Sequence, residues 1–234
     1  VDGVLALDAG SLTRALTFQQ QSGIKAILLS HHHFDHIRDL WTLGFHIKGV
    51  ETTIDIYGID DTIDYVRSTL LNTHNAPDFT KVPSPDNPTF RFRTINFYEE
   101  FRVLGYDVLA LPVPHSVPAA GYQVSDGSVK LFYTGDTGKG LSGVWSHVSP
   151  DVLLSEVTYG NENEAHAVER GHLTPELLGE ALDDFKAELG YLPIVLATHI
   201  NPPWEDAVRS GLKELSKRLG IEIIVSESDM VMKL

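Results

Sequence analysis

Short apolar runs alternate with amphipathic stretches along most of this chain. Apolar runs bounded by turn residues predict buried strands, here at residues 3–8, 24–30, 52–57, 108–114, 151–155, 193–197, 221–225 and 230–234. Apolar positions at helical spacing, with capping residues before them, predict helices, here at residues 12–21, 37–47, 60–71, 174–189 and 205–219. Strands that alternate with helices are typical of an α/β fold.

The middle of the chain has a different pattern. Residues 75–88 contain four prolines together with Asn, Asp and Ser, which predicts a loop and a candidate rim of a site. Short alternating strands follow from residue 89, and Asp126-Gly127 between two apolar segments predicts a hairpin. No linker or internal repeat interrupts the pattern, so we expect a single domain over residues 1–234.

The composition is that of an ordinary globular protein. Of the 234 residues 42% are hydrophobic, and no apolar run has the length of a bilayer span. No signal-peptide pattern is seen, but the first residue is Val1 rather than methionine, which leaves a missing N-terminal segment open. Cysteine is absent, which excludes disulfides, thiolate zinc sites and a cysteine nucleophile, and favours the cytoplasm.

The formal net charge of −14 bears on the partners. A broad nucleic-acid surface needs many Lys and Arg side chains to displace counterions, so this charge disfavours one. Bound divalent cations would neutralise part of the acidity.

The segment H-x-H-x-D-H follows the apolar run of the second expected strand. It contributes His31, His33, Asp35 and His36. Imidazole and carboxylate groups are ligands for zinc and similar metals. Residues i and i+2 of an extended segment point to the same side, so His31 and His33 can bind one ion together. Asp35 and His36 begin the next turn and can face a second ion.

Three further apolar segments also end in a potential ligand: His115, Asp136 in Thr-Gly-Asp-Thr-Gly, and His199. Side chains at the carboxyl ends of neighbouring strands converge on one edge of a sheet. Each of these residues alone fits a polar loop or turn position. Together they complete a ligand count suited to two ions with open positions for water and substrate.

At this point the sequence resembles the metallo-β-lactamase superfamily, on residues 5–10, the 31–36 motif, His115, Thr-Gly-Asp-Thr-Gly and Thr198-His199. The resemblance implies a four-layer αββα sandwich of two mixed β-sheets flanked by helices. It also implies a binuclear centre, with His31, His33 and His115 on one ion, Asp35, His36 and His199 on the other, and Asp136 bridging. Asp8 would steady the motif loop.

Within that superfamily, Ser155-Glu156-Val157-Thr158-Tyr159 and Gly171-His172-Leu173-Thr174 resemble the ribonuclease Z and class II cyclic-nucleotide phosphodiesterase branch. There the matching histidine assists at the scissile phosphate, which implies a catalytic role for His172 beside Asp35. Only 20 residues separate His115 from Asp136, where tRNA-processing members commonly carry a long arm. The short gap and the acidity disfavour long structured tRNA.

These observations predict a phosphodiesterase for a small diester, such as a cyclic nucleotide or short RNA. Two divalent ions, zinc first and manganese or iron as alternatives, would hold a shared water as hydroxide for the attack. The same ligands would serve a carboxylic ester, thioester or lactone hydrolase, and a non-catalytic metal-binding protein is a third possibility. The resemblance also suggests a homodimer.

Overall fold

The computed structural model describes residues 1–50, 52–74, 77–228 and 230–233. The chain falls into two compact units, residues 1–105 and 106–234. Each unit has its own hydrophobic core. Among the described residues, no helix combines the length and apolarity that crossing a bilayer demands.

The first unit is built on a parallel sheet in the order β1-β2-β3-β4, formed by β1 (Leu5–Leu7), β2 (Ala26–Leu28), β3 (Ile54–Gly58) and β4 (Phe90–Thr94). Its other elements are α1 (Leu12–Ala15), α2 (Phe18–Gly23), α3 (Phe34–Ile37), α4 (Asp39–Ile47), α5 (Asp60–Tyr65), the π-helical turn η1 (Val66–Leu70) and β5 (Glu100–Val103). Side chains of β2, β3 and α4 meet in its core, together with Phe79 from the proline-rich segment.

The second unit contains six strands in the order β11-β10-β9-β8-β7-β6. They are β6 (Tyr106–Val113), β7 (Ala119–Ser125), β8 (Lys130–Tyr133), β9 (Val152–Glu156), β10 (Ile194–Thr198) and β11 (Ile223–Val225). Strands β6, β7 and β8 pair in antiparallel fashion, and β8 to β11 pair in parallel. The expected mixed character therefore belongs to this sheet, because the pairings described for the first sheet are all parallel.

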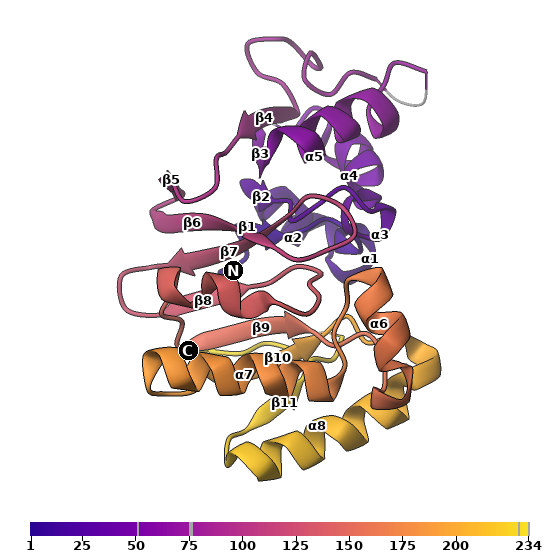
Figure 1. Ribbon diagram of the computed structural model, residues 1–234. Helices are drawn as coiled ribbons and strands as arrows, with labels where there is room; N and C mark the ends of the chain where they lie inside the picture. The colour runs from indigo at the N-terminus through magenta and orange to yellow at the C-terminus, as the bar shows by residue number, and fades with distance from the viewer. Residues whose placement is uncertain (51, 75–76, 229, 234) are drawn as a thin grey trace. The chain divides into compact units, whose positions relative to one another are not determined.

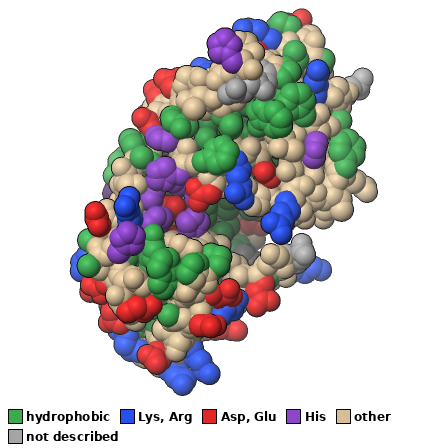
Figure 2. Space-filling view, turned by 90° about the vertical axis from the view of Figure 1, so that its right-hand side faces the viewer, with side chains coloured by type: hydrophobic (Ala, Val, Ile, Leu, Met, Phe, Trp, Pro, Cys, Tyr) green, Lys and Arg blue, Asp and Glu red, His purple; other side chains and the backbone are tan. Residues whose placement is uncertain are grey.

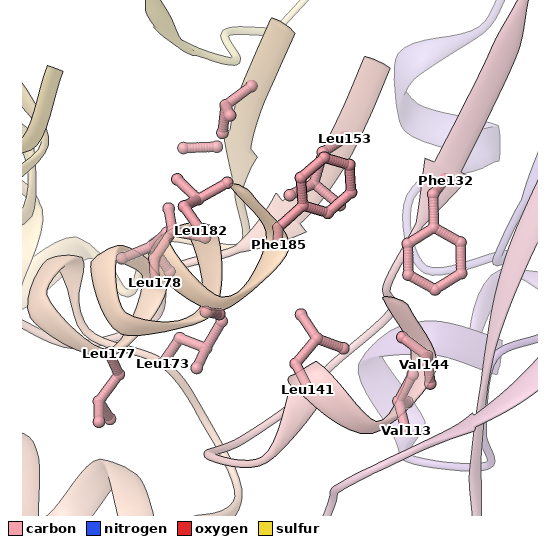
Figure 3. Close-up of a cluster of buried hydrophobic side chains, with 14 of the residues drawn as sticks. Val113, Phe132, Leu141, Val144, Leu153, Leu173, Leu177, Leu178, Leu182 and Phe185 are labelled. Atoms are coloured by element: carbon pink, nitrogen blue, oxygen red, sulfur yellow. The ribbon is translucent and has the colours of Figure 1, made fainter. Parts of the chain in front are cut away.

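Helices flank the parallel half of this second sheet (Figure 1). They are η2 (Leu141–His147), η3 (Asn161–Asn163), α6 (Glu164–Arg170), α7 (Pro175–Leu189), η4 (Pro202–Trp204) and α8 (Glu205–Leu219). Apolar side chains of α7, among them Leu178, Leu182 and Phe185, pack with Phe132 and Leu153 of the strands (Figure 3). Trp145 is buried in the same core and donates its indole N–H to Ala181 O over 3.0 Å.

The element predictions are mostly confirmed, with four differences. The helix expected at 12–21 is two helices, because Leu16 is extended and Thr17 begins α2 with a capping box to Gln20. The helix expected at 60–71 changes to π-helical geometry after Tyr65. Helix α6 was not predicted. The strand expected at 230–234 is wrong for 230–233, which have no regular structure, and residue 234 lies outside the described residues.

Candidate functional site

The histidine motif of the first unit lies directly after β2, where the chain turns into α3. His31 is fully buried, and its Nε2 lies 2.9 Å from Nδ1 of His33. The ring of His36 lies 4.2 Å from that of His31, measured between centroids. Three imidazoles therefore lie close together within this unit.

The carboxylate of Asp8 holds this cluster in place by hydrogen bonds. One carboxylate oxygen accepts the backbone N–H of Ser30 over 2.6 Å, and the other lies 2.7 Å from both Ser30 Oγ and His36 Nδ1. Ser30 Oγ in turn lies 3.0 Å from Nδ1 of His31. Asp8 thus fixes Nδ1 of His36 directly and Nδ1 of His31 through Ser30, so that their Nε2 atoms face His33 and Asp35, two other candidate ligands. This fits the supporting role expected of Asp8.

A close backbone contact sets the position of Asp35. Gly10 packs so tightly against the motif that a Cβ atom there would lie 1.7 Å from the carbonyl oxygen of Asp35. The Asp35 side chain itself is about half exposed, and its Oδ2 lies 3.7 Å from His36 Nε2. Asp35 is therefore accessible to water and small molecules beside the imidazoles.

The second unit carries the other predicted residues at the ends of its strands. His115 follows β6, Asp136 follows β8 and His199 follows β10. Asp136 is buried; its Oδ1 lies 3.4 Å from His199 Nε2 and its Oδ2 lies 4.0 Å from His115 Nε2. The convergence expected of strands sharing a sheet edge is present within this unit.

The Nδ1 atoms of these histidines are also held. His115 Nδ1 donates to the carbonyl of Gly171 over 2.7 Å, and His199 Nδ1 lies 2.9 Å from Thr158 Oγ1. Burial lowers the pKa of His115, with the bond to Gly171 opposing it, so the ring is neutral at pH 7 and able to bind a cation. A neutral imidazole with its second nitrogen fixed is the usual state of a metal-ligating histidine, so the donor set fits a divalent metal in both units.

His172 is fixed differently. Its Nδ1 lies 2.8 Å from Oε1 of Glu156 and 3.9 Å from Oδ2 of Asp136. Its ring stacks on that of His199 at 5.7 Å between centroids and 14° between planes. Ligand atoms of Asp136, His172 and His199 all lie within 4.8 Å of one another. His172 therefore sits among the candidate ligands but is anchored to a carboxylate, and its side chain is 14% exposed.

Glu156 is the residue that sequence reasoning left without a role. It is fully buried at the end of β9 and accepts backbone N–H groups from Thr137, Thr158 and Leu173 as well as the Thr158 hydroxyl. Its hydrogen bonds therefore connect Thr137, Thr158 and the His172-Leu173 pair, which lie in three separate segments of the chain. Two signals in the sequence pointed to it: its place in the Ser155-Glu156-Val157-Thr158-Tyr159 segment, and an acidic residue at the end of an apolar strand, where burial without a task is costly.

Histidine side chains reach the surface on the face shown in Figure 2. Two histidines outside the candidate ligand set have ordinary structural partners. His46 bonds Gln21, and His32 stacks on Tyr65 and lies 2.9 Å from Asp61.

Comparisons with known proteins identify the family of this chain. A family model described as "Beta-lactamase superfamily domain" matches residues 2–200. The probable metallo-hydrolase YhfI of Bacillus subtilis is 28% identical over 185 residues, 74% of this chain and 67% of that protein. The match covers 21% of the length of two further curated relatives.

Solved structures share the fold. The metallo-β-lactamase fold protein YhfI matches with a TM-score of 0.76 and 22% identity, over 98% of this chain and 87% of the other. Yeast PDE1 matches with 0.78 and 19%, over 90% and 69%. The short form of human tRNase Z matches with 0.68 and 21%, over 100% and 89%.

Proposed function

The chain belongs to the β-lactamase superfamily, and from this premise we propose that it is a binuclear metal-dependent phosphodiesterase acting on a small phosphodiester. The fold expected from the sequence is confirmed, and the relatives compared are named metallo-hydrolase, PDE1 and tRNase Z. A metal-dependent hydrolase is the enzyme class that these names share. The phosphodiester substrate is our proposal.

We propose that residues 1–234 act as one hydrolase domain, in which both units supply ligands. His31, His33 and His115 would bind one ion, Asp35, His36 and His199 the other, and Asp136 would bridge. The support is chemical: Nδ1 of four of the five candidate histidines is already held by a carboxylate, hydroxyl or carbonyl group, namely in His31, His36, His115 and His199. Zinc is the first metal to test, and manganese or iron suits the same nitrogen and oxygen donors.

With two divalent ions bound, the centre supplies an activated water and positive charge beside the phosphate. Asp35, whose carboxylate is exposed next to His36, would orient that water and accept its proton. The water oxygen would then attack phosphorus in line with the leaving oxygen, and the bond to that oxygen would break. His172 gives the leaving oxygen a proton from Nε2, while Glu156 holds the opposite nitrogen.

One observation carries the preference for phosphodiesters. His172 is fixed by a buried carboxylate beside Asp136 and His199, yet it is not needed to complete the proposed ligand set. Carbonyl hydrolysis needs little more than the activated water, whereas departure of an alkoxide from phosphorus benefits from a positioned acid.

The test is a side-by-side assay of the zinc- and manganese-loaded protein on a cyclic nucleotide, on bis(p-nitrophenyl) phosphate and on a panel of thioesters and lactones. We expect His172→Ala to lower cleavage of the cyclic nucleotide at least 100-fold, because its alkoxide leaving group needs a proton. Cleavage of bis(p-nitrophenyl) phosphate should fall less, because nitrophenolate is a good leaving group. Metal content should stay unchanged, and the exposed control His74→Ala should have no effect. Carbonyl hydrolysis that is indifferent to His172 would contradict the proposal and favour the ester, thioester or lactone alternative. Metal binding without any turnover would favour the non-catalytic alternative. The homodimer stays a prediction, which light scattering would test.

A further inference from the structure

Exposed aromatic side chains lie immediately beside the histidine motif of the first unit. Phe34 stands between His33 and Asp35 in the chain, and 66% of it is exposed. A single exposed phenylalanine is ordinary, but exposed aromatic side chains that lie together on one surface indicate a binding site.

Phe34 is one end of a helical stripe. Arg38 has helical backbone angles and connects α3 to α4, so positions 34, 38, 41 and 45 follow one side of a nearly continuous helix. They are occupied by Phe34, Arg38, Trp41 and Phe45, and Trp41 and Phe45 are 38% and 42% exposed. Exposed hydrophobic side chains and basic side chains are visible together on the face shown in Figure 2.

The stripe borders a groove with a volume of about 420 Å³, lined by Phe34, Arg38, Asp39, Trp41, Thr42 and Leu70. This volume is within the range of small-molecule sites. Phe34 and Arg38 line the groove and stand in the same helical segment as Asp35 and His36, so the groove is next to the proposed diester site.

The charged groups along the groove are held in place. Arg38 donates Nε–H to the carbonyl of Gly10 over 2.6 Å and Nη2–H to Ser11 Oγ over 3.2 Å. Asp39 accepts two bonds from Thr13, at 2.7 and 2.9 Å. The ring of Trp41 contacts that of Phe45 at 4.8 Å, and Phe45 contacts the buried ring of Phe79 at 5.3 Å. The aromatic platform is therefore backed by the core of its unit.

From this arrangement we propose that the groove binds the base of a nucleotide whose phosphodiester lies at the histidine motif, so the substrate is a nucleotide diester. Flat aromatic rings flanking a guanidinium are the elements on which nucleobases stack. The net charge of −14 argues against a long polyanion, and one groove of this volume suits one base. This inference rests on the proposed function and extends it to the non-reacting part of the substrate.

The probe pair is adenosine 5′-monophosphate and ribose 5-phosphate, which share the sugar and phosphate and differ in the base. Both are titrated into the zinc-loaded full chain carrying Trp204→Phe, with tryptophan fluorescence as the readout. The remaining tryptophans are Trp41 in the groove and Trp145, which is 1% exposed. We expect adenosine 5′-monophosphate to quench the emission and ribose 5-phosphate to leave it nearly unchanged.

Phe34→Ala should weaken the binding of adenosine 5′-monophosphate about tenfold, because stacking on one aromatic ring is worth about that factor. The matched control is Phe18→Ala on α2, which removes a phenylalanine that is 58% exposed but does not line the groove, and it should change nothing. Equal binding of the two probes, or binding that is indifferent to Phe34, would overturn the inference. So would light scattering that shows a wild-type dimer and a Phe34→Ala monomer, because the stripe would then be a contact between copies of the chain.

The two proposals fail separately. If the base-dependent quenching requires Phe34 but no diester is cleaved, the phosphodiesterase assignment fails and the groove stands. If the cyclic nucleotide is cleaved with dependence on His172 but Phe34 has no effect on nucleotide binding, the groove alone fails.

Discussion

Glu156→Gln is the substitution that tests the site most directly, because it keeps the shape of the side chain and changes only its hydrogen bonding. In the native chain Oε1 accepts from Thr137 N–H at 3.2 Å and contacts His172 Nδ1 at 2.8 Å, while Oε2 accepts from Thr158 N–H at 3.0 Å and Leu173 N–H at 3.2 Å. A glutamine amide has one oxygen and one NH₂ group. Whichever way it turns, at least one buried backbone N–H faces another donor.

The size of the effect follows from that count. A buried donor left without an acceptor costs about 1–3 kcal/mol, and bonds to a charged acceptor are worth about 1.5–3 kcal/mol each. The least costly orientation keeps the oxygen toward Thr158 and Leu173 and sacrifices the bond from Thr137. The amide NH₂ then meets His172 Nδ1, which must become an acceptor. We expect the free energy of unfolding to fall by about 2–4 kcal/mol, which lowers Tm by roughly 5–15 °C.

The same change should alter catalysis without removing a proposed metal ligand. With Nδ1 accepting from the amide, the carboxylate that stabilises a protonated His172 ring is gone, so donation to the leaving oxygen is weakened. We expect diester cleavage to fall at least tenfold at constant zinc content. Thermal unfolding, metal analysis and the diester assay are compared with Glu188→Gln, an exposed glutamate on α7. Native-like Tm together with native activity in Glu156→Gln would refute the reasoning.

Two further predictions concern the two units separately. Gly10→Ala should disrupt the first cluster, because its Cβ would overlap the Asp35 carbonyl at 1.7 Å. Calorimetric titration should show zinc binding weakened at least tenfold. The control for a general effect of glycine replacement is Gly143→Ala, where no atom lies within 4 Å of the added Cβ. In the second unit, hydrogen bonds from Val129 and Ser128 lower the pKa of Asp126 to about 2. A carboxylate with a lowered pKa stabilises the fold above its unfolded value, about 3.9, and loses that contribution as the pH falls toward 2. The difference in Tm between wild type and Asp126→Ala should therefore be constant above pH 5 and shrink from pH 4 downward, and a pH-independent difference would count against the hydrogen-bonded carboxylate as its cause.

Where metal-binding residue types stand at the ends of predicted strands, the sequence predicted correctly which candidate ligands lie close together within each unit. The H-x-H-x-D-H segment predicted converging imidazoles, and within the first unit they converge. His115, Asp136 and His199 were expected at strand ends, and they meet in the second unit because parallel strands share an edge. These contacts could be predicted because the residues are either close together in the sequence or at the same position, the carboxyl end of a strand, in one sheet.

The partners that hold the ligands could not be anticipated. Glu156 reaches Thr137 and Leu173, which lie 19 and 17 residues away along the chain, and His115 bonds a carbonyl 56 residues away. No local pattern encodes such distances. The strand expected at 230–234 was an error of the opposite kind, since alternating apolar residues indicated pairing that the described residues there do not form.

Gly171 links three parts of the second unit at one backbone position. It ends α6 in a left-handed conformation, its carbonyl accepts from His115, and a side chain there would lie 2.9 Å from the backbone nitrogen of Ser116. Gly138 packs against it equally closely. The C-terminal end of α6 is therefore fixed relative to His115. Its N-terminal end follows the largely exposed segment 161–164 and has no side-chain cap. Insertions and deletions in this helix should be tolerated at its N-terminal end and eliminated at its C-terminal end, so natural variation in its length should accumulate before residue 164 and leave Gly171-His172 in place.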